Sequence, residues 1–103
     1  MSIKYNQEKI DFNQLNSQIN PYFSLLLKQL LPSGRLENHE YVALNPTRLD
    51  KHPGSFRINT FTGKWADFAT GDKGGDFISL WAYVKGISQT DAARALQTIV
   101  GGA

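Results

Sequence analysis

The residue types that most often bind metals or act as nucleophiles are scarce in this sequence of 103 residues, which has two histidines and no cysteine. Without cysteine there is no disulfide, no thiolate nucleophile and no thiolate ligand for zinc or an iron–sulfur cluster. His39 and His52 are not spaced as a metal-binding pair, and no serine lies in a nucleophile elbow. We therefore expect no metal, no other cofactor and no catalytic residue, and hence a protein that is not an enzyme.

A glycine-rich segment, residues 71–75, precedes a helix that we expect to begin after Asp76. Backbone N–H groups at a helix N-terminus can bind an anion such as phosphate. The spacing of these glycines, however, matches neither the dinucleotide-binding fingerprint nor the P-loop. We therefore interpret Asp76 as a helix N-cap rather than the segment as a nucleotide site.

Positive charge is concentrated in the middle of the chain. Eleven Lys and Arg residues against nine Asp and Glu residues leave a net charge of +2, which is too small for bulk charge to drive binding to nucleic acid. Residues 28–64, however, hold six basic and three acidic residues. Such a cluster is typical of phosphate contact, although a solvated surface explains it equally well.

The N-terminal third of the chain is expected to be loose over residues 1–10 and helical over residues 11–33. Asn20 fits an N-cap and Pro21 fits the first position of a helix. Between Tyr22 and Leu31, apolar side chains occupy nearly all sides of this helix. Such a helix is either buried in the core or covered by a partner.

Short extended segments are expected over residues 40–70. Residues 41–44 and 55–59 have strand-forming sequences, and the second alternates apolar and polar side chains. The turn sequence Thr62-Gly63 then leads into a third strand, residues 64–68. These segments predict a small antiparallel sheet of three or four strands.

Residues 76–100 predict two helices, the first of which ends at Gly86. The core-facing side of this first helix is formed by Phe77, Leu80, Trp81 and Val84. Core packing is also the favoured role of Trp65 and Phe68. The chain is therefore expected to form one α+β domain over residues 1–103, in which helices precede and follow the strands of the sheet along the chain. It has no membrane-spanning stretch and no secretory signal, so we expect a cytoplasmic protein with no membrane partner.

Four short motifs in the middle of the chain follow one another in a recognisable order. They are Asn45-Pro46-x-Arg48, Gly54-Ser55-Phe56, Gly63-x-Trp65-x-Asp67-Phe68 and Gly74-Gly75-Asp76. With the helix pair that follows, this arrangement resembles the N-terminal zinc-ribbon domain of DNA primases from phages, plasmids and mobile elements, especially primase-helicases. The resemblance covers residues 34–98 and implies a zinc-ribbon-like sheet.

The chain departs from that family at the four zinc ligands. Where the family has a Cys-x-x-His and a Cys-x-x-Cys pair, this chain has Asn45 and Arg48, then Asp67 and Thr70. The chain is therefore a cysteine-free version in which no zinc is expected. In place of the metal we expect a charge-assisted, bidentate pair between Arg48 and Asp67. Asn45 and Thr70 are expected to complete its hydrogen bonds.

The resemblance implies a non-catalytic DNA-binding module that helps a replication or priming system engage its single-stranded template. Basic residues of the hairpin and its loops are expected to contact phosphates, and one exposed aromatic residue, Phe61 or Trp65, is expected to stack on a base. The candidate DNA-binding residues are Arg48, Lys51, Arg57, Phe61, Lys64, Trp65 and Lys73. Because the phosphate contacts are few, binding by the isolated domain is expected to be weak and sensitive to salt.

A protein-docking domain is the alternative. In this interpretation the chain binds a primase, a helicase or another replication protein, and no nucleic acid. The apolar helix from Tyr22 to Leu31 supports it if one face of that helix stays exposed. A mobile-element protein that interferes with the replication of a host or a rival element is a third possibility.

Overall fold

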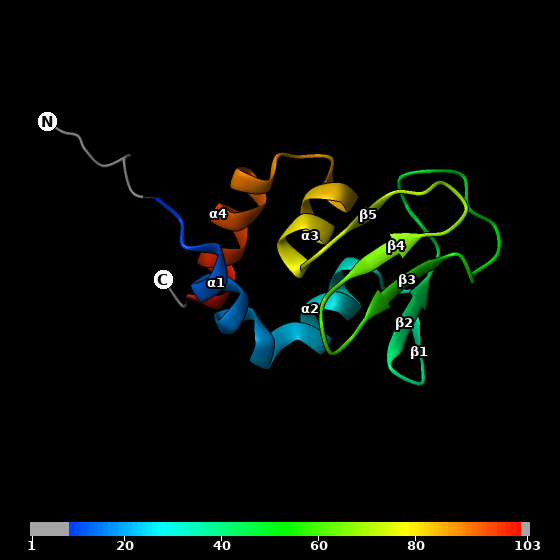
Figure 1. The fold of residues 1–103 in the computed structure, drawn as a ribbon, viewed down its shortest axis with the longest axis horizontal. Helices are drawn as coiled ribbons and strands as arrows, with labels where there is room; N and C mark the ends of the chain where they lie inside the picture. Colours follow the sequence, from blue (N-terminus) through cyan, green and yellow to red (C-terminus); the bar gives the residue numbers. More distant parts are fainter. Residues whose placement is uncertain (1–8, 102–103) are drawn as a thin grey trace, which may run out of the picture.

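The computed structural model describes residues 9–101, which form an N-terminal helical segment, a five-stranded antiparallel sheet and two C-terminal helices (Figure 1). The α+β class expected from the sequence is therefore confirmed. Of the segment expected to be loose, residues 1–8 lie outside the described residues, and residues 9 and 10 belong to no helix or strand. No helix within the described range is long and apolar enough to cross a membrane.

The N-terminal segment consists of α1 (Phe12–Ile19), a 3-10 turn η2 (Asn20–Tyr22) and α2 (Phe23–Leu30). Asp11 caps α1, because its side chain accepts a hydrogen bond from the backbone N–H of Gln14 at 3.0 Å. The expected N-cap at Asn20 is wrong, since Asn20 lies inside η2 and α2 begins only at Phe23. Pro21 explains the difference, because it lacks the N–H that a continuous helix would use.

The sheet is a meander in which every strand pairs with its neighbour in sequence. Its strands are β1 (Arg35–Glu37), β2 (Glu40–Ala43), β3 (Phe56–Asn59), β4 (Trp65–Asp67) and β5 (Lys73–Gly74). The expected count of three or four strands is wrong. The two edge strands have three and two residues, which is too short for an alternating pattern to reveal them.

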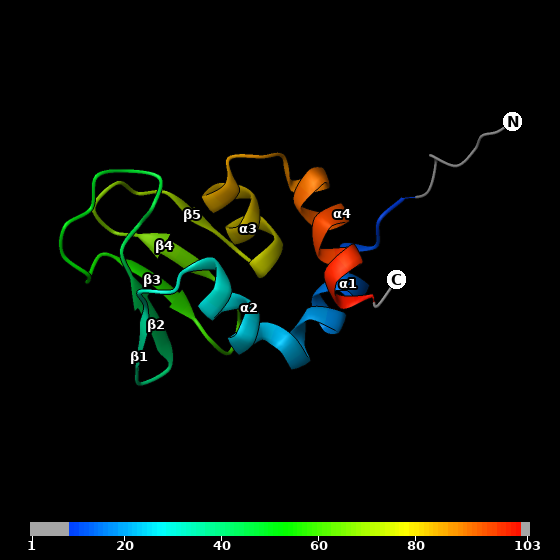
Figure 2. The same cartoon turned by 180° about the vertical axis from the view of Figure 1, so that it is seen from behind.

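One face of the sheet, the inner face, forms the core with the helices. The register aligns Tyr41, Ile58 and Trp65 in one row across this face, and Phe56 and Asp67 in the next. The apolar members of these rows are buried in a cluster with side chains of α2 and α3, which lie against this side of the sheet (Figures 1 and 2). Within residues 9–101, no helix lies against the opposite, outer face (Figures 1 and 2).

The C-terminal helices are α3 (Phe77–Lys85) and α4 (Gln89–Val100). Asp76 caps α3 as predicted, and it forms a capping box with Ser79. Gly86 ends α3 as predicted, in a left-handed conformation with φ of 69° that favours glycine. The helix α4 turns back and packs on α1, away from the sheet (Figure 2).

Candidate functional site

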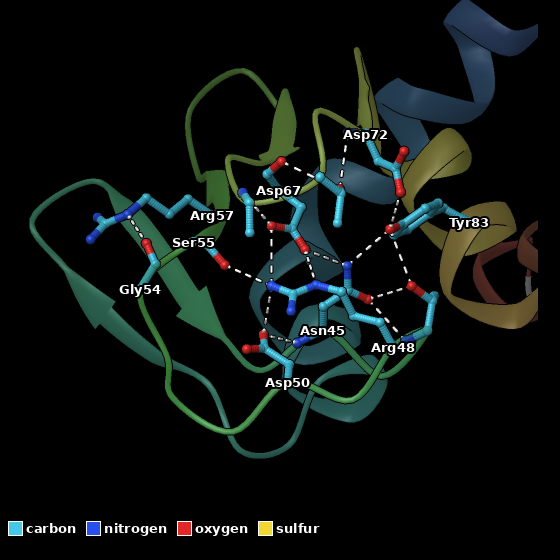
Figure 3. A network of polar contacts seen from close by, with 12 residues as sticks. Asn45, Arg48, Asp50, Gly54, Ser55, Arg57, Asp67, Asp72 and Tyr83 are labelled. Atoms are coloured by element: carbon cyan, nitrogen blue, oxygen red, sulfur yellow. Dashed lines mark hydrogen bonds and ion pairs between the residues drawn. The ribbon is translucent and has the colours of Figure 1, made fainter.

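A buried carboxylate lies in a network of polar contacts at one end of the inner face (Figure 3). Asp67 is fully buried and accepts four hydrogen bonds. Arg48 donates to it from Nε at 2.8 Å and from Nη2 at 3.3 Å, and Asn45 donates from Nδ2 at 2.8 Å. The backbone N–H of Ala69 supplies the fourth, at 2.9 Å. Each carboxylate oxygen therefore accepts two hydrogen bonds. We call Asn45, Arg48 and Asp67 the polar centre.

Asn45 connects the polar centre to α3. This residue is buried, and its Nδ2 donates to the hydroxyl of Tyr83 at 2.9 Å as well as to Asp67. Its Oδ1 accepts from the backbone N–H and the hydroxyl of Thr47, at 2.9 and 2.8 Å. All hydrogen-bonding positions of the amide are therefore occupied within the protein.

Arg48 connects the polar centre to the start of β3. Its Nη2 donates to Ser55 Oγ at 2.9 Å and lies 3.5 Å from Asp50 Oδ2. Asp50 in turn accepts from the backbone N–H of Asn45 at 2.8 Å. The loop after β2 and the ends of β3 and β4 are thus joined through one guanidinium group.

The electrostatics of the polar centre keep it ionised at neutral pH. Burial by itself raises the pKa of Asp67, but hydrogen bonds from Arg48 and Asn45 and the backbone N–H of Ala69 outweigh burial. They hold the pKa of this carboxyl well below its usual value of 3.8. The hydrogen bond to Asp67 also raises the pKa of Arg48. Asp67 and Arg48 therefore form an ion pair with good geometry.

The predicted pair of Arg48 and Asp67 is confirmed, and so is its hydrogen bond from Asn45. The predicted contribution of Thr70 is wrong. Its hydroxyl is 3.5 Å from the backbone carbonyl of Asp67 and accepts from the backbone N–H of Asp72, so it stabilises the turn after β4 instead. Among residues 9–101, no group of three or more His, Asp or Glu side chains is placed to hold a metal ion.

The outer face of the sheet carries a shallow hollow of about 360 Å³, which we call the outer hollow. Ala66 lies on β4 between Lys64 and Phe68, and all three line the hollow. Because side chains alternate along a strand, these three residues share the outer face. Arg57 lies opposite Ala66 on β3, and Lys73 lies opposite it on β5. Three basic residues therefore surround one small apolar residue.

The three cations differ in how far they are neutralised. Arg57 donates to the carbonyl of Gly54 at 2.8 Å and to Glu40 at 3.0 Å, and lies 3.7 Å from Glu37. Lys64 and Lys73 form no ion pair with any residue that the structure describes. These two lysines are therefore the cations of the outer face best placed to meet an anion.

Two of the candidate DNA-binding residues are held by contacts within the protein. Trp65 is only 5% exposed on the inner face, where its Nε1 donates to Ser79 Oγ at 2.9 Å and its ring packs on Tyr83. The predicted stacking of Trp65 on a base is therefore wrong, and its predicted place in the core is confirmed. Arg48 is paired with Asp67 through Nε and Nη2, and its side chain remains 28% exposed.

The exposed aromatic residue of the outer face is Phe68, which the sequence placed in the core. Its ring is 72% exposed beside the outer hollow. The alternation of Lys64, Ala66 and Phe68 was the signal that could have identified it. Phe61 is 74% exposed on the β3–β4 turn, next to the ring of His39. Lys51 is exposed on the loop between β2 and β3 and does not line the outer hollow.

The polar centre and the outer hollow have different chemical capacities. The polar centre satisfies its own hydrogen bonds, so it stabilises loops and offers little to a substrate. The outer hollow is lined by Lys64, by Arg57 with its ion-pair partner Glu40, and by the exposed Phe68, and Lys73 lies on the neighbouring strand. This combination suits a ligand that carries both negative charge and a flat apolar group. Neither a family model nor a curated protein matches this sequence.

Proposed function

We propose that this protein is a non-catalytic module that binds single-stranded DNA through the outer face of its sheet, as part of a replication or priming system. One observation carries the proposal: Lys64 and the exposed Phe68 line the shallow outer hollow beside Ala66, and Lys73 lies opposite Ala66 on the neighbouring strand β5. Single-strand binding proteins combine the same two elements, a cationic surface along the backbone and an aromatic ring for a base.

The contacts divide between backbone and base. Lys64 and Lys73 meet phosphates, while Arg57 is weaker because Glu40 already neutralises much of its charge. One base stacks on Phe68, a contact worth about 1–3 kcal/mol. The side chain of Ala66 is small enough to leave room for that base. With only two phosphate contacts and one stacked base, the affinity of the isolated domain for DNA should be weak. A weak affinity is consistent with a module of a larger assembly.

The resemblance to the primase zinc ribbon belongs to the same proposal. In this view the sheet is zinc-ribbon-like, and the polar centre replaces the metal. The support is that Asn45, Arg48 and Asp67, which stand at three ligand positions of the family, meet in one hydrogen-bonded cluster. Thr70, at the fourth position, is adjacent but does not join the cluster.

The test is fluorescence anisotropy of a labelled single-stranded oligonucleotide at about 50 and 200 mM salt. The wild-type protein should bind saturably, and more weakly at the higher salt. Lys64→Ala and Lys73→Ala should each weaken binding and lower the salt slope by about 0.7, and Phe68→Ala should weaken binding with the slope unchanged. Arg94→Ala is the control, because it removes one exposed cation from α4, far from the outer face. Equal effects of Arg94→Ala and the lysine variants would contradict the proposal.

The docking alternative has one observation of its own. Leu26 and Leu27 of α2 are buried, but Leu25 is 59% exposed. Leu25 and the exposed Leu36 line a mostly apolar groove of about 480 Å³ between α2 and the edge strand β1. The apolar helix is therefore not wholly covered. If a flat oligonucleotide titration is accompanied by binding to a purified primase or helicase that Leu25→Ser abolishes, docking is the function instead.

A further inference from the structure

A second hollow, of about 420 Å³, lies between α1 and the β3–β4 turn, and we call it the amide cleft. Figures 1 and 2 show this turn reaching the junction of η2 and α2. One wall is a row of asparagines at positions i, i+3 and i+7, namely Asn13, Asn16 and Asn20. The opposite wall is the turn, residues 60–63, and the rings of Phe23 and Phe77 also line the cleft. Its volume lies within the range of small-molecule sites.

The charge of the amide cleft excludes phosphate as its ligand. Of its lining residues, all of which the structure describes, Asp76 alone carries a charge. Its carboxylate accepts from Asn16 Nδ2 at 3.0 Å and from the backbone N–H of Ser79 at 2.8 Å, which leaves each oxygen a further lone pair. A ligand group that faces Asp76 must therefore donate a hydrogen bond and carry no negative charge.

The remaining groups of the cleft suit a flat ring with a polar edge. The side-chain amides of Asn13 and Asn20 form no hydrogen bond with any residue from 9 to 101, so each presents a donor and an acceptor side by side. The partly buried Phe23 provides apolar surface next to these amides, and the buried Phe77 packs against its ring. Phe61 adds an exposed ring on the turn. A nucleobase has this combination of apolar faces and in-plane donors and acceptors.

The amide cleft and the outer hollow adjoin the same residue of the β3–β4 turn. Thr62 lines both of them, and Lys64, which borders the outer hollow, is two residues further along the chain. A strand whose phosphates follow Lys64 can therefore continue around the β3–β4 turn. Its next base then reaches the cleft.

We infer that the amide cleft binds one base of the bound strand and selects a base that has an exocyclic amino group, such as cytosine or adenine, over thymine. The inference rests on the proposed function, because the outer face delivers the strand. The amino group donates to Asp76, and an asparagine amide pairs with the neighbouring donor and acceptor of the base, as these side chains do in base recognition elsewhere. Thymine places carbonyl oxygens on both sides of its single N–H, and these face the carboxylate unfavourably.

The test compares labelled oligo-dC and oligo-dT, each about 12 nucleotides long, by anisotropy with the full chain. The wild-type protein should bind oligo-dC about tenfold more tightly, the discrimination of one good base contact. The double variant Asn13→Ala/Asn20→Ala should reduce this preference, because it removes the pairing amides and keeps Asp76, and should leave the affinity for oligo-dT unchanged. Gln18→Ala is the matched control, because it removes an exposed amide of α1 that does not line the cleft. Equal affinities in the wild type, or a preference as large in the double variant as in the wild type, overturn the inference.

A second measurement separates this inference from the proposed function. Free cytidine is titrated while the side-chain amide NMR signals of Asn13 and Asn20 are followed. Shifts of these signals without binding of either oligonucleotide would reject the outer-face proposal and retain the cleft as a base site. No shift and no strand binding would reject both. Shifts with a neutral monosaccharide instead of cytidine would overturn the inference in favour of a sugar site.

Discussion

Replacing Asp67 with asparagine tests whether the polar centre stabilises the fold. The substitution keeps the size of a fully buried side chain and removes its charge. Asp67 accepts four hydrogen bonds, two on each oxygen. An asparagine can accept only two, because its Nδ2 is a donor and would face donors of the polar centre. Asp67→Asn therefore leaves two donors without an acceptor and the Arg48 guanidinium without its buried counter-charge.

The expected loss follows from these contacts. Hydrogen bonds to a charged group contribute about 1.5–3 kcal/mol each, so two lost bonds give about 3–6 kcal/mol. Removing one partner of a buried ion pair costs about 3–5 kcal/mol. The Arg48 side chain is 28% exposed, and water can solvate it once its partner is lost. We therefore expect the lower end, about 3 kcal/mol, a large share of the free energy of unfolding of a small domain.

Urea unfolding followed by tryptophan fluorescence measures this change, because Trp65 lies in the core. With a slope of about 1.5 kcal/mol/M, a loss of 3 kcal/mol lowers the unfolding midpoint by about 2 M. The control is Asp91→Asn, which makes the same chemical change at an exposed position of α4 and should alter stability by less than about 0.5 kcal/mol.

The reasoning fails if Asp67→Asn is no more destabilising than Asp91→Asn. A double-mutant cycle of Arg48→Ala and Asp67→Ala then separates the ion pair from the other contacts of the carboxylate. Additive effects in that cycle would show that Arg48 and Asp67 do not act together. A positive coupling energy would support a structural ion pair between Arg48 and Asp67.

Three further predictions concern acid, a helix end and a cap. The folded-state pKa of Asp67 lies below its unfolded value near 3.8. The ionised carboxylate therefore contributes fully to stability above that value, and this contribution is lost as the pH falls from about 5 towards the folded pKa. The urea midpoint of the wild-type protein should fall in acid, and that of Asp67→Asn should fall less steeply. Gly86→Ala should destabilise by about 1 kcal/mol, read as a lower melting temperature, because φ of 69° strains a side chain; an unchanged melting temperature would contradict the left-handed cap. Ser79→Ala should lower the free energy of unfolding by about 1–2 kcal/mol in urea unfolding, because it removes two hydrogen bonds. One joins the Ser79 side chain to the backbone of Asp76 in the capping box, and in the other Ser79 Oγ accepts from Trp65 Nε1. A loss below about 0.3 kcal/mol would show that neither bond contributes to stability.

The helix ends were predictable where the signal is local. Asp76 caps α3 and Gly86 ends it because both effects depend on a residue and the backbone within one turn. Asn20 has the right residue type for a cap, but Pro21 beside it produces a 3-10 turn that only the structure revealed. The edge strand β5 has two residues and forms by pairing with β4, so its own sequence contains no pattern that predicts it.

The candidate site was predictable in part. The pair of Arg48 and Asp67 was predictable because the resemblance places both residues where the primase zinc ribbon has metal ligands, although they are far apart in sequence. Ser55 and Tyr83 also bond to the polar centre. Ser55 directly precedes β3 and Tyr83 belongs to α3, and no spacing in the sequence relates them to the polar centre. Phe68 was assigned to the core from its type alone, and the strand alternation opposes that assignment.

By itself, the sequence determined which chemistry is absent, where the local caps fall and which residues alternate along a strand. These properties depend on residue type and on neighbours within a few positions. Only the tertiary structure decided which face of the sheet is covered by helices. Packing of α2 and α3 on the inner face buried Trp65 and left Phe68 exposed, since a strand offers two faces and burial depends on helices that are distant in the chain. The same packing brought α1 to the β3–β4 turn and so created the amide cleft.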